Sequence, residues 1–560
     1  MVINWLEWSK EAFERAKSEK KPVLLDIYGV WCHWCHEMDR TYEDSDVVRI
    51  INENFIPVRA DTDKRPDINE RYNQGGWPST VFLTDEGKII TGATYLRPRE
   101  MRSLLLQVSK LYEDSGSKVE GDVLSIKPKP AKKAGISDSI SAEILEALIE
   151  NFDIDYGGVG FGPKFPLSDA VELAFLKYRK TKDKKLLKFA TMTLDGIIGA
   201  MNRPVSGLLD NEEGGFFRYS VSRDWSLPHY EKMLETNAGL LINCLHAYQI
   251  TADEKYRKAA EKTIGYIKNY LSNPEGGFYG SQDADGEDAY YGKPIEGRRK
   301  MEPPFIDKTI YTNLSSLMAA AFLEAYLVLD IEYCKEFALR TVEFLLQNCY
   351  DKDKGMLHYY NGKANISGLA TDNIYFMRAL LDCSIYDKKY LEHAEALARF
   401  LIENLKEKGG AFFDRIKGDD DIGQLRMRNK PINDNSVAAE CFLMLAVFTG
   451  DESYKKIAEE ILEDFSAEYK RYGIHAAGYA LAIENFIDPV EIAVAGMKDE
   501  LLKMLKYFEP RKIIVFIDLE KDRAMAEKKG YTEEGVYVCH KMACNKFVNA
   551  DEAIKYLEGK

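Results

Sequence analysis

The residues of this chain best suited to do chemistry are two cysteines three positions apart, Cys32 and Cys35, with His36 directly after them. An apolar run over residues 22–28 precedes them and is typical of a buried strand, and a helical pattern follows. A thiol at the start of a helix faces unpaired backbone N–H groups and the positive end of the helix dipole, which lowers its pKa. We therefore predict a redox-active pair in which Cys32 attacks and Cys35 resolves.

Three other interpretations of this motif remain open. Cys-x-x-Cys-His also fits c-type haem attachment, but that requires export, and we expect no signal peptide because residues 1–21 have the pattern of an amphipathic helix. Two Cys and two His could hold zinc, although neighbouring residues on a helix point apart. The cysteines could also be small core residues. We expect a redox pair with no metal and no cofactor.

The composition limits the class of protein. A chain of 560 residues is too long for one core and predicts two to four domains. Its net charge of -15 argues against nucleic acid or an anionic membrane surface as partner, and we find no apolar run of the about 18 residues that would span a membrane. Nine cysteines, an odd number, fit a reducing compartment. We predict a cytoplasmic protein with no nucleic-acid and no membrane partner.

Changes in composition divide the chain into segments. Residues 113–137 have few large apolar side chains and include a Lys-Pro-Lys-Pro run, which is typical of a linker. We predict an α/β domain over residues 1–112, a helical domain over 138–488 and a small α/β unit over 489–560. In the last of these, Cys539 and Cys544 lie five positions apart and form either a second dithiol or a pair of structural or metal-binding thiols.

The helical domain contains an internal repeat. A glycine turn with apolar or aromatic neighbours recurs six times, and two helical patterns lie between successive turns. The helices that lead into the turns are amphipathic, whereas those that leave them are apolar nearly all round. We therefore predict six inner helices ringed by six outer ones, an (α/α)6 toroid. The turns lie at Gly157, Gly214, Gly276, Gly355, Gly409 and Gly473.

The inner helices of such a ring begin at one end, where the long loops also gather, so we predict a binding site there. Carboxylates and histidines there could act as acids and bases, and aromatic side chains could stack on sugar rings. Helix capping would by itself explain the Asn and Asp residues at the helix starts, but not His229, Glu231 or the acidic cluster at 283–287, for which a calcium loop is a further interpretation. The candidates are His229, Glu231, Asp283, Asp285, Asp372 and Asp434 for catalysis and Tyr219, Trp225, Phe278, Tyr279, Asn313 and Asn435 for substrate binding.

Two sets of residues resemble known families. Asp26, six residues before Cys32, and the pair Trp77-Pro78 give the first 110 or so residues the layout of a thioredoxin-like domain. That resemblance implies that Asp26 relays a proton to Cys35 and that Pro78 is a cis-proline facing the disulfide. More of the chain resembles the thioredoxin domain-containing family that includes spermatogenesis-associated protein 20, which joins such a domain to a six-hairpin-glycosidase-like toroid related to N-acylglucosamine 2-epimerases. The runs that carry this second resemblance are 32–36, 65–67, 76–84, 215–221, 228–234 and 277–279 with 283–285.

Three functional classes remain open. We expect a thioredoxin-like thiol–disulfide redox domain joined to a carbohydrate-binding or carbohydrate-active (α/α)6 toroid with a role in carbohydrate metabolism, its reaction unassigned. The alternatives are a sugar epimerase, isomerase or glycoside hydrolase with a regulatory redox domain, and a non-catalytic binding protein. The partners that we expect are a sugar or glycosylated ligand and a redox partner protein.

Overall fold

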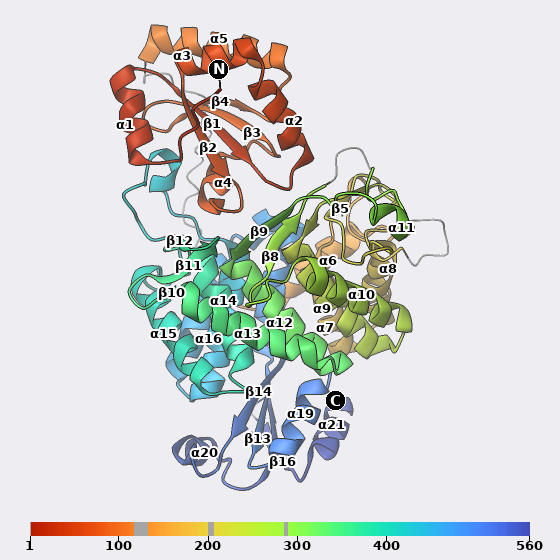
Figure 1. Ribbon diagram of the computed structural model, residues 1–560. Coiled ribbons are helices and arrows are strands. Elements are labelled where there is room, and N and C mark those ends of the chain that lie inside the picture. Colours follow the sequence, from red (N-terminus) through yellow and green to blue (C-terminus); the bar gives the residue numbers. More distant parts are fainter. Residues whose placement is uncertain (1, 117–132, 200–206, 285–288, 542, 560) are drawn as a thin grey trace. The chain divides into compact units, whose positions relative to one another are not determined.

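The computed structural model describes residues 2–116, 133–199, 207–284, 289–541 and 543–559 (Figure 1). These residues form two compact units, each discontinuous in sequence. The first unit contains residues 1–130, 282–307 and 414–429, and the second contains residues 131–281, 308–413 and 430–560.

The first unit is built on a four-stranded sheet with the order β2-β1-β3-β4. β1 runs parallel to β2 and antiparallel to β3. Val23, Leu25 and Ile27 of β1 face one apolar cluster and Leu24 faces another, because successive side chains of a strand point to opposite faces. The elements are α1 (Lys10–Glu19), β1 (Val23–Tyr28), α2 (His33–Tyr42), α3 (Ser45–Asn54), β2 (Ile56–Asp61), α4 (Pro66–Tyr72), β3 (Ser79–Leu83), β4 (Ile89–Ala93) and α5 (Pro98–Ser115).

Two later segments complete the first unit, whereas the sequence assigned both to the toroid. Residues 282–307 include α11 (Ile295–Arg298), and residues 414–429 include the 3-10 helix η3 (Gly423–Arg426). Leu425 packs into the apolar cluster that contains Val23, Leu25 and Ile27 of β1. Arg71 forms an ion pair with Asp414 at 2.6 Å. These contacts join residues more than 300 positions apart, which no local sequence pattern could indicate.

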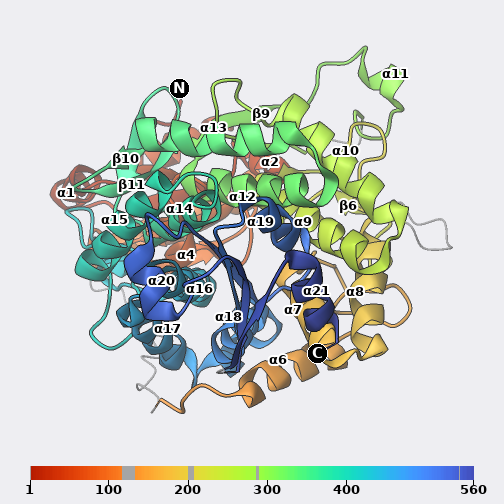
Figure 2. The same ribbon diagram turned by 90° about the horizontal axis from the view of Figure 1, so that it is seen from below.

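The second unit contains a closed ring of helices (Figure 2). Six inner helices contact one another in the order α7, α9, α12, α14, α16, α18 and back to α7, and an outer helix packs beside each. This is the (α/α)6 toroid that the repeat predicts. The inner helices are α7 (Ser168–Thr181), α9 (Leu234–Thr251), α12 (Thr312–Leu329), α14 (Ala370–Cys383), α16 (Ile432–Thr449) and α18 (Ala477–Ile487). The outer helices are α8 (Lys184–Ile197), α10 (Glu254–Tyr270), α13 (Glu332–Asn348), α15 (Lys389–Asn404), α17 (Glu452–Phe465) and α6 (Asp138–Glu150), and the 3-10 helix η4 (Tyr469–Ala476) precedes α18.

The helix α12 is apolar for a structural reason. Among the helices of the described ranges, it is the one long and apolar enough to cross a membrane by length and composition. The sequence analysis expected no such segment. Half of that stretch is buried inside the protein, because an inner helix of the ring contacts other helices on most of its sides.

Short strands lie at the ends of the inner helices where the glycine turns gather. One sheet has the order β10-β11-β9-β8-β7, with β12 paired to β11, and β5 pairs with β6. The C-terminal sheet has the order β14-β13-β15-β16, and Cys539 and Cys544 lie opposite each other on its last two strands, joined as a disulfide. The strands and remaining helices are β5 (Tyr219–Ser220), β6 (Pro228–His229), β7 (Lys232–Met233), β8 (Tyr279–Gln282), β9 (Ile306–Tyr311), β10 (Tyr350–Asp351), β11 (Gly355–Tyr360), β12 (Ala364–Ser367), β13 (Val490–Ala495), α19 (Lys498–Lys506), β14 (Lys512–Ile517), α20 (Arg523–Lys529), β15 (Gly535–His540), β16 (Ala543–Phe547) and α21 (Ala550–Glu558).

The fourth residue of four inner helices holds the preceding glycine turn by its backbone. In α16, Asn435 accepts a hydrogen bond from the N–H of Phe412 at 2.7 Å and donates to the carbonyl oxygen of the same residue at 3.0 Å. Asn237 of α9 makes the same two bonds to Phe216. Ser315 of α12 and Asn373 of α14 bind the turns at Phe278 and Met356. We call these four residues, Asn237, Ser315, Asn373 and Asn435, the turn clamp.

We predict that Asn435→Ala destabilises the protein by roughly 2 to 4 kcal/mol, because it leaves two buried backbone groups of Phe412 without partners. The measurement is the midpoint of urea unfolding followed by circular dichroism. Asn433→Ala is the matched control, since Asn433 lies on the same helical turn but is exposed. Equal midpoints for the two variants would contradict the role of the clamp.

Candidate functional site

The two cysteines of the redox motif lie at the start of α2. Cys32 is the N-cap residue, and its Sγ accepts a hydrogen bond from the N–H of Cys35 at 3.2 Å. Both residues are buried and joined as a disulfide, with their Cα atoms 5.2 Å apart. In the reduced protein, the first-turn N–H groups would stabilise a thiolate on Cys32.

A buried acid lies on β1, the strand that leads to this motif. Asp26 is 1% exposed, contacts Arg59 Nε at 2.8 Å and accepts a hydrogen bond from the hydroxyl of Tyr42 at 3.3 Å. Burial raises the pKa of Asp26 to about 6, although the Arg59 guanidinium opposes the shift. Arg59 also binds Asp39 at 2.6 Å, so its charge is shared between two carboxylates. Asp26 can therefore take up and release a proton near neutral pH.

Aromatic residues fix the loops around the disulfide. The peptide bond between Trp77 and Pro78 is cis, as the thioredoxin resemblance implied. Trp31, directly before Cys32, donates a hydrogen bond to Asp63 at 2.7 Å and contacts the Trp77 ring edge-on at 5.5 Å. The sequence analysis did not assign a role to Trp31 or Asp63, because their contact joins two loops that lie 32 positions apart.

Asp283 lies beside the redox motif rather than in the toroid, where the sequence analysis placed it. Its Oδ2 lies 2.8 Å from Nε2 of His36, and both residues belong to the first unit. The hydrogen bond that the imidazole donates to Asp283 raises the pKa of His36. Asp285, the neighbouring candidate, lies outside the described residues.

A histidine–carboxylate pair lies in the second unit, at the glycine-turn end of the ring. His229 Nδ1 and Glu231 Oε2 are 2.5 Å apart, and Arg218 approaches the other oxygen of Glu231 at 3.8 Å. The ring of His229 stacks on Tyr219, which in turn stacks on Phe165. Because Glu231 is buried and His229 is partly exposed, the carboxylate can orient an imidazole that remains accessible. Three candidates from the sequence thus lie together.

A cavity of about 340 Å³ opens at the first turns of several inner helices. Asp169 and Glu235, the second residues of α7 and α9, line it together with Asn433 of α16. Both side chains expose surface to the cavity, but the surrounding helices remove them from bulk solvent. This desolvation raises the pKa of Asp169 to about 6, with Glu440 and Glu172 adding to the shift, and it also raises the pKa of Glu235. The sequence analysis missed both acids. Their shared position in the repeat, second in an inner helix, is the signal that could have found them.

Four candidates from the sequence have structural roles instead. Trp225 and Phe278, predicted to stack on sugars, are fully buried, Trp225 against Gly158 and Phe278 among other aromatic side chains. Asn435 belongs to the turn clamp. Asp372 is buried and lies 2.9 Å from Nδ1 of His358, a contact that gives it a structural role. The residue types and their positions in the repeat gave no sign of whether these side chains are buried.

The remaining candidates are partly exposed. Tyr279 begins β8, and Asn313 and Asp434 lie in the first turns of α12 and α16. The buried Oδ1 atom of Asn313 has no hydrogen-bond partner among the described residues. Asp434 adds to burial in raising the pKa of Tyr375. In the described part of the chain, no group of three or more His, Cys, Asp or Glu side chains is arranged to hold a metal ion.

Comparisons with known proteins agree with this organisation. Residues 1–127 match the family model Thioredox_DsbH, described as a protein of unknown function, DUF255. Spermatogenesis-associated protein 20 of Mus musculus is 31% identical over 324 residues, which cover 53% of this chain and 40% of that protein. The chain is homologous to proteins named spermatogenesis-associated protein 20. The family resemblance predicted from the motifs is therefore confirmed, although the alignment spans less than half the length of that relative.

Two further matches involve single parts of the chain. The thiol:disulfide interchange protein DsbD of Yersinia pestis is 30% identical over 82 residues, which cover 14% of this chain and 14% of that protein. The cellobiose 2-epimerase of Spirochaeta thermophila aligns in structure with a TM-score of 0.48 and 14% identity, over 62% of this chain and 96% of that one. The spermatogenesis-associated protein 20 relatives match more of the chain in sequence than the interchange protein does.

We predict that Asp26→Asn stabilises the protein above pH 6, by up to about 3 kcal/mol. The folded-state pKa of about 6 exceeds that of an unfolded aspartate, so stability is greatest below about pH 4 and falls as the pH rises to 6. The Asp26→Asn variant has no ionisable group at this position, so its stability does not fall in this way between pH 4 and pH 6. Unfolding by urea at pH 7.5 and at pH 4 measures the difference, which should nearly vanish at the lower pH.

Asp39→Asn is the matched control, because it removes the partly exposed partner of the same Arg59 and should change stability little. If Asp26→Asn instead lowered stability at pH 7.5, the attraction between Asp26 and Arg59 would outweigh the cost of burying the carboxylate.

Proposed function

We propose that the chain is a thiol–disulfide oxidoreductase whose active couple is Cys32 and Cys35. The observation that carries this proposal is the position of Cys32 at the cap of α2, where its sulfur accepts the N–H of Cys35. Asp26, with a pKa near 6, supplies a proton acceptor on the adjoining strand. The similarity of the first domain to a thiol:disulfide interchange protein supports the same reaction.

The proposed reaction is a two-electron exchange. The Cys32 thiolate attacks one sulfur of a client disulfide, forming a mixed disulfide, and the other client sulfur leaves as a thiolate. Cys35 then loses its proton to the Asp26 carboxylate and attacks the Cys32 sulfur, which releases the second client thiolate. The client is reduced and the Cys32–Cys35 pair oxidised, and an external dithiol returns the pair to its reduced form.

We predict that Cys35→Ser accumulates a mixed disulfide through Cys32, because the resolving thiol is missing. Cys32→Ser should form none. The measurement is mass spectrometry after incubation with oxidised glutathione, together with the rate of exchange, which we expect to fall at least about 100-fold in both variants.

The double variant Cys539→Ser/Cys544→Ser is the control, since it removes the other pair and should leave this exchange unchanged. Full exchange activity in Cys32→Ser would contradict the proposal. Loss of activity in the double variant alone would assign the couple to the C-terminal sheet.

A second function, carbohydrate binding or turnover, is favoured by the cavity that Asp169 and Glu235 line. We propose that its raised-pKa acids and the nearby Thr236 and Asn433 bind the hydroxyl groups of a sugar. An acid that is partly protonated near neutral pH can protonate a leaving oxygen, so a glycosidase reaction suits Asp169. The pair of His229 and Glu231 suits an epimerase or isomerase reaction instead.

We predict that Asp169→Asn abolishes sugar binding or lowers turnover by about 10²-fold or more. Isothermal titration with mono- and disaccharides, and a screen of aryl glycosides, provide the measurements. Glu261→Gln, a partly exposed carboxylate of the outer helix α10, is the control. A protein that binds no sugar while its thiols still exchange would exclude this second function and leave the first intact.

We further propose a disulfide-bearing or glycosylated protein as partner and the cytoplasm as compartment. Five free cysteines are all buried, which suits a chain kept in a reducing environment.

A further inference from the structure

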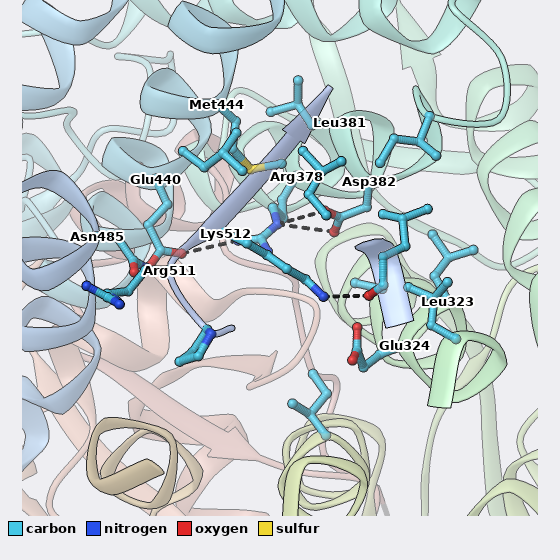
Figure 3. A pocket seen from close by; sticks show the side chains of 18 of the residues that line it. Leu323, Glu324, Arg378, Leu381, Asp382, Glu440, Met444, Asn485, Arg511 and Lys512 are labelled. Carbon is cyan, nitrogen blue, oxygen red and sulfur yellow. Dashed lines mark hydrogen bonds and ion pairs between the residues drawn. The ribbon is translucent and has the colours of Figure 1, made fainter. Parts of the chain in front are cut away.

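A second cavity lies inside the helix ring, and neither proposed reaction uses it (Figure 3). Its volume of about 410 Å³ falls within the range of small-molecule sites. Side chains of all six inner helices line it, and residues 510–514 at the start of β14 lie across one side. Asp169 is the one lining residue that it shares with the sugar cavity, so the two cavities otherwise present separate surfaces.

Two cations of the lining are each held by a pair of carboxylates. His246 Nδ1 lies 2.7 Å from Glu172, and its Nε2 lies 3.4 Å from Glu324. Burial opposes the charge, but the two glutamates outweigh it and raise the pKa of His246 to about 10. His246 is therefore a permanent cation whose charge is already balanced by its neighbours.

The guanidinium of Arg378 is bound in the same way. Its Nε contacts Asp382 at 3.1 Å, and its Nη1 contacts Glu440 at 3.2 Å (Figure 3). Lys512 donates hydrogen bonds to the backbone carbonyls of Leu505 and Tyr507, and burial lowers its pKa. The positive groups thus have their partners within the protein.

The lining carries more hydrogen-bond acceptors than donors. The four carboxylates Glu172, Glu324, Asp382 and Glu440 outnumber the three cations His246, Arg378 and Lys512, and Arg511 is bound by Asp488 and Glu509 outside the lining. Burial raises the pKa of Asp382, which Arg378 opposes, and lowers that of Lys512, while the raised pKa of Asp169 makes it chiefly a further source of acceptor oxygens. Each carboxylate can accept about four hydrogen bonds, more than the protein supplies here. Asn485 donates to Glu440, and its buried Oδ1 has no partner among the described residues.

Most of the remaining lining is aliphatic, with the aromatic side chains of Tyr386 and Phe448 among it. Leu323 of α12, Leu381 of α14 and Met444 of α16 face the same space as the charged groups (Figure 3). Leu327 of α12 also lines the cavity. A ligand that fills the cavity therefore contacts an apolar wall on one part of its surface. On another part it contacts carboxylate oxygens that can still accept hydrogen bonds and whose negative charge exceeds the positive charge of the lining.

We propose that this cavity binds a small organic cation with an aliphatic body, an alkyl amine or diamine. Its ammonium groups would donate to Glu324 and Glu440, and its methylene groups would cover the leucine side chains. An anion would bind less well, because each cation of the lining already has a partner within the protein. A neutral polyol would also bind less well, because it would neither balance the excess negative charge nor cover the apolar side chains.

Four probes with the same five-carbon chain but different end groups distinguish the effect of ligand charge on binding from that of ligand shape. They are 1,5-diaminopentane, 5-amino-1-pentanol, pentane-1,5-diol and glutarate. Isothermal titration of the full chain at pH 7.5 measures their affinities. We expect the diamine to bind at least about tenfold more tightly than the diol, the amino alcohol to lie between them, and glutarate not to bind. Equal binding of the diol, or binding of glutarate, would overturn the proposal and assign the cavity to a polyol or an anion.

Two variants locate the site. Glu324→Gln and Glu440→Gln should each weaken diamine binding at least about tenfold, because each removes one acceptor of the lining without changing its shape. Glu261→Gln, the same change on an outer helix, should not. The melting temperature of each variant is measured first, and the second glutamate keeps the test decisive if one variant fails to fold. No binding of the diamine, or unchanged affinity in both variants, would overturn the proposal.

Discussion

The turn clamp is the interaction on which the second unit depends. The glycine turns at Gly157, Gly214 and Gly276 bring their backbone so close to an outer helix that a Cβ there would collide with a carbonyl oxygen, which for Gly214 is that of Lys262. The residue that follows the turn is buried, and its N–H and C=O would lack partners in an apolar environment. Side chains such as Asn237 and Asn435 supply both partners from the first turn of an inner helix. The same bond therefore fixes the turn and the start of the helix.

The common starting level of the inner helices determines which side chains lie along the axis of the ring. Because the inner helices begin together, their second residues approach one another, and Gly478 of α18 lies where a Cβ would contact the carboxylate of Asp169. Six helices in a ring leave space at the centre, and that space is divided into two cavities that share Asp169. Polar groups occupy it because such a space admits water or a ligand. The raised pKa values of Asp169 and Glu235 follow from this partial removal from solvent.

The redox site depends on residues from three parts of the first unit. The N-terminus of α2 favours a thiolate on Cys32, while the buried Asp26 on β1 favours the protonated acid. His36 connects the motif to Asp283, and Arg71 connects α4 to Asp414. Residues from two later segments thus belong to the same unit as the thiols, and one of them, Asp283, contacts the redox motif directly.

The sequence by itself determined the features that rest on local spacing. The period of the glycine turns and the contrast between amphipathic and apolar helices predicted the toroid, since both follow from which helix faces water. The cysteine spacing and the strand before it predicted the redox motif, because strand, turn and helix are set by neighbouring residues. The family resemblance rested on the same short runs.

Only the tertiary structure decided which candidates meet a ligand. Trp225 and Tyr219 are both aromatic and were both predicted to bind a sugar, yet Trp225 is buried whereas Tyr219 stacks on His229. Asn435 and Asn433 lie two positions apart, yet one binds a turn and the other faces a cavity. Asp283 lies beside His36, 247 positions away in the chain. Burial and contacts between distant residues arise from the packing of many elements at once, and no local pattern records them.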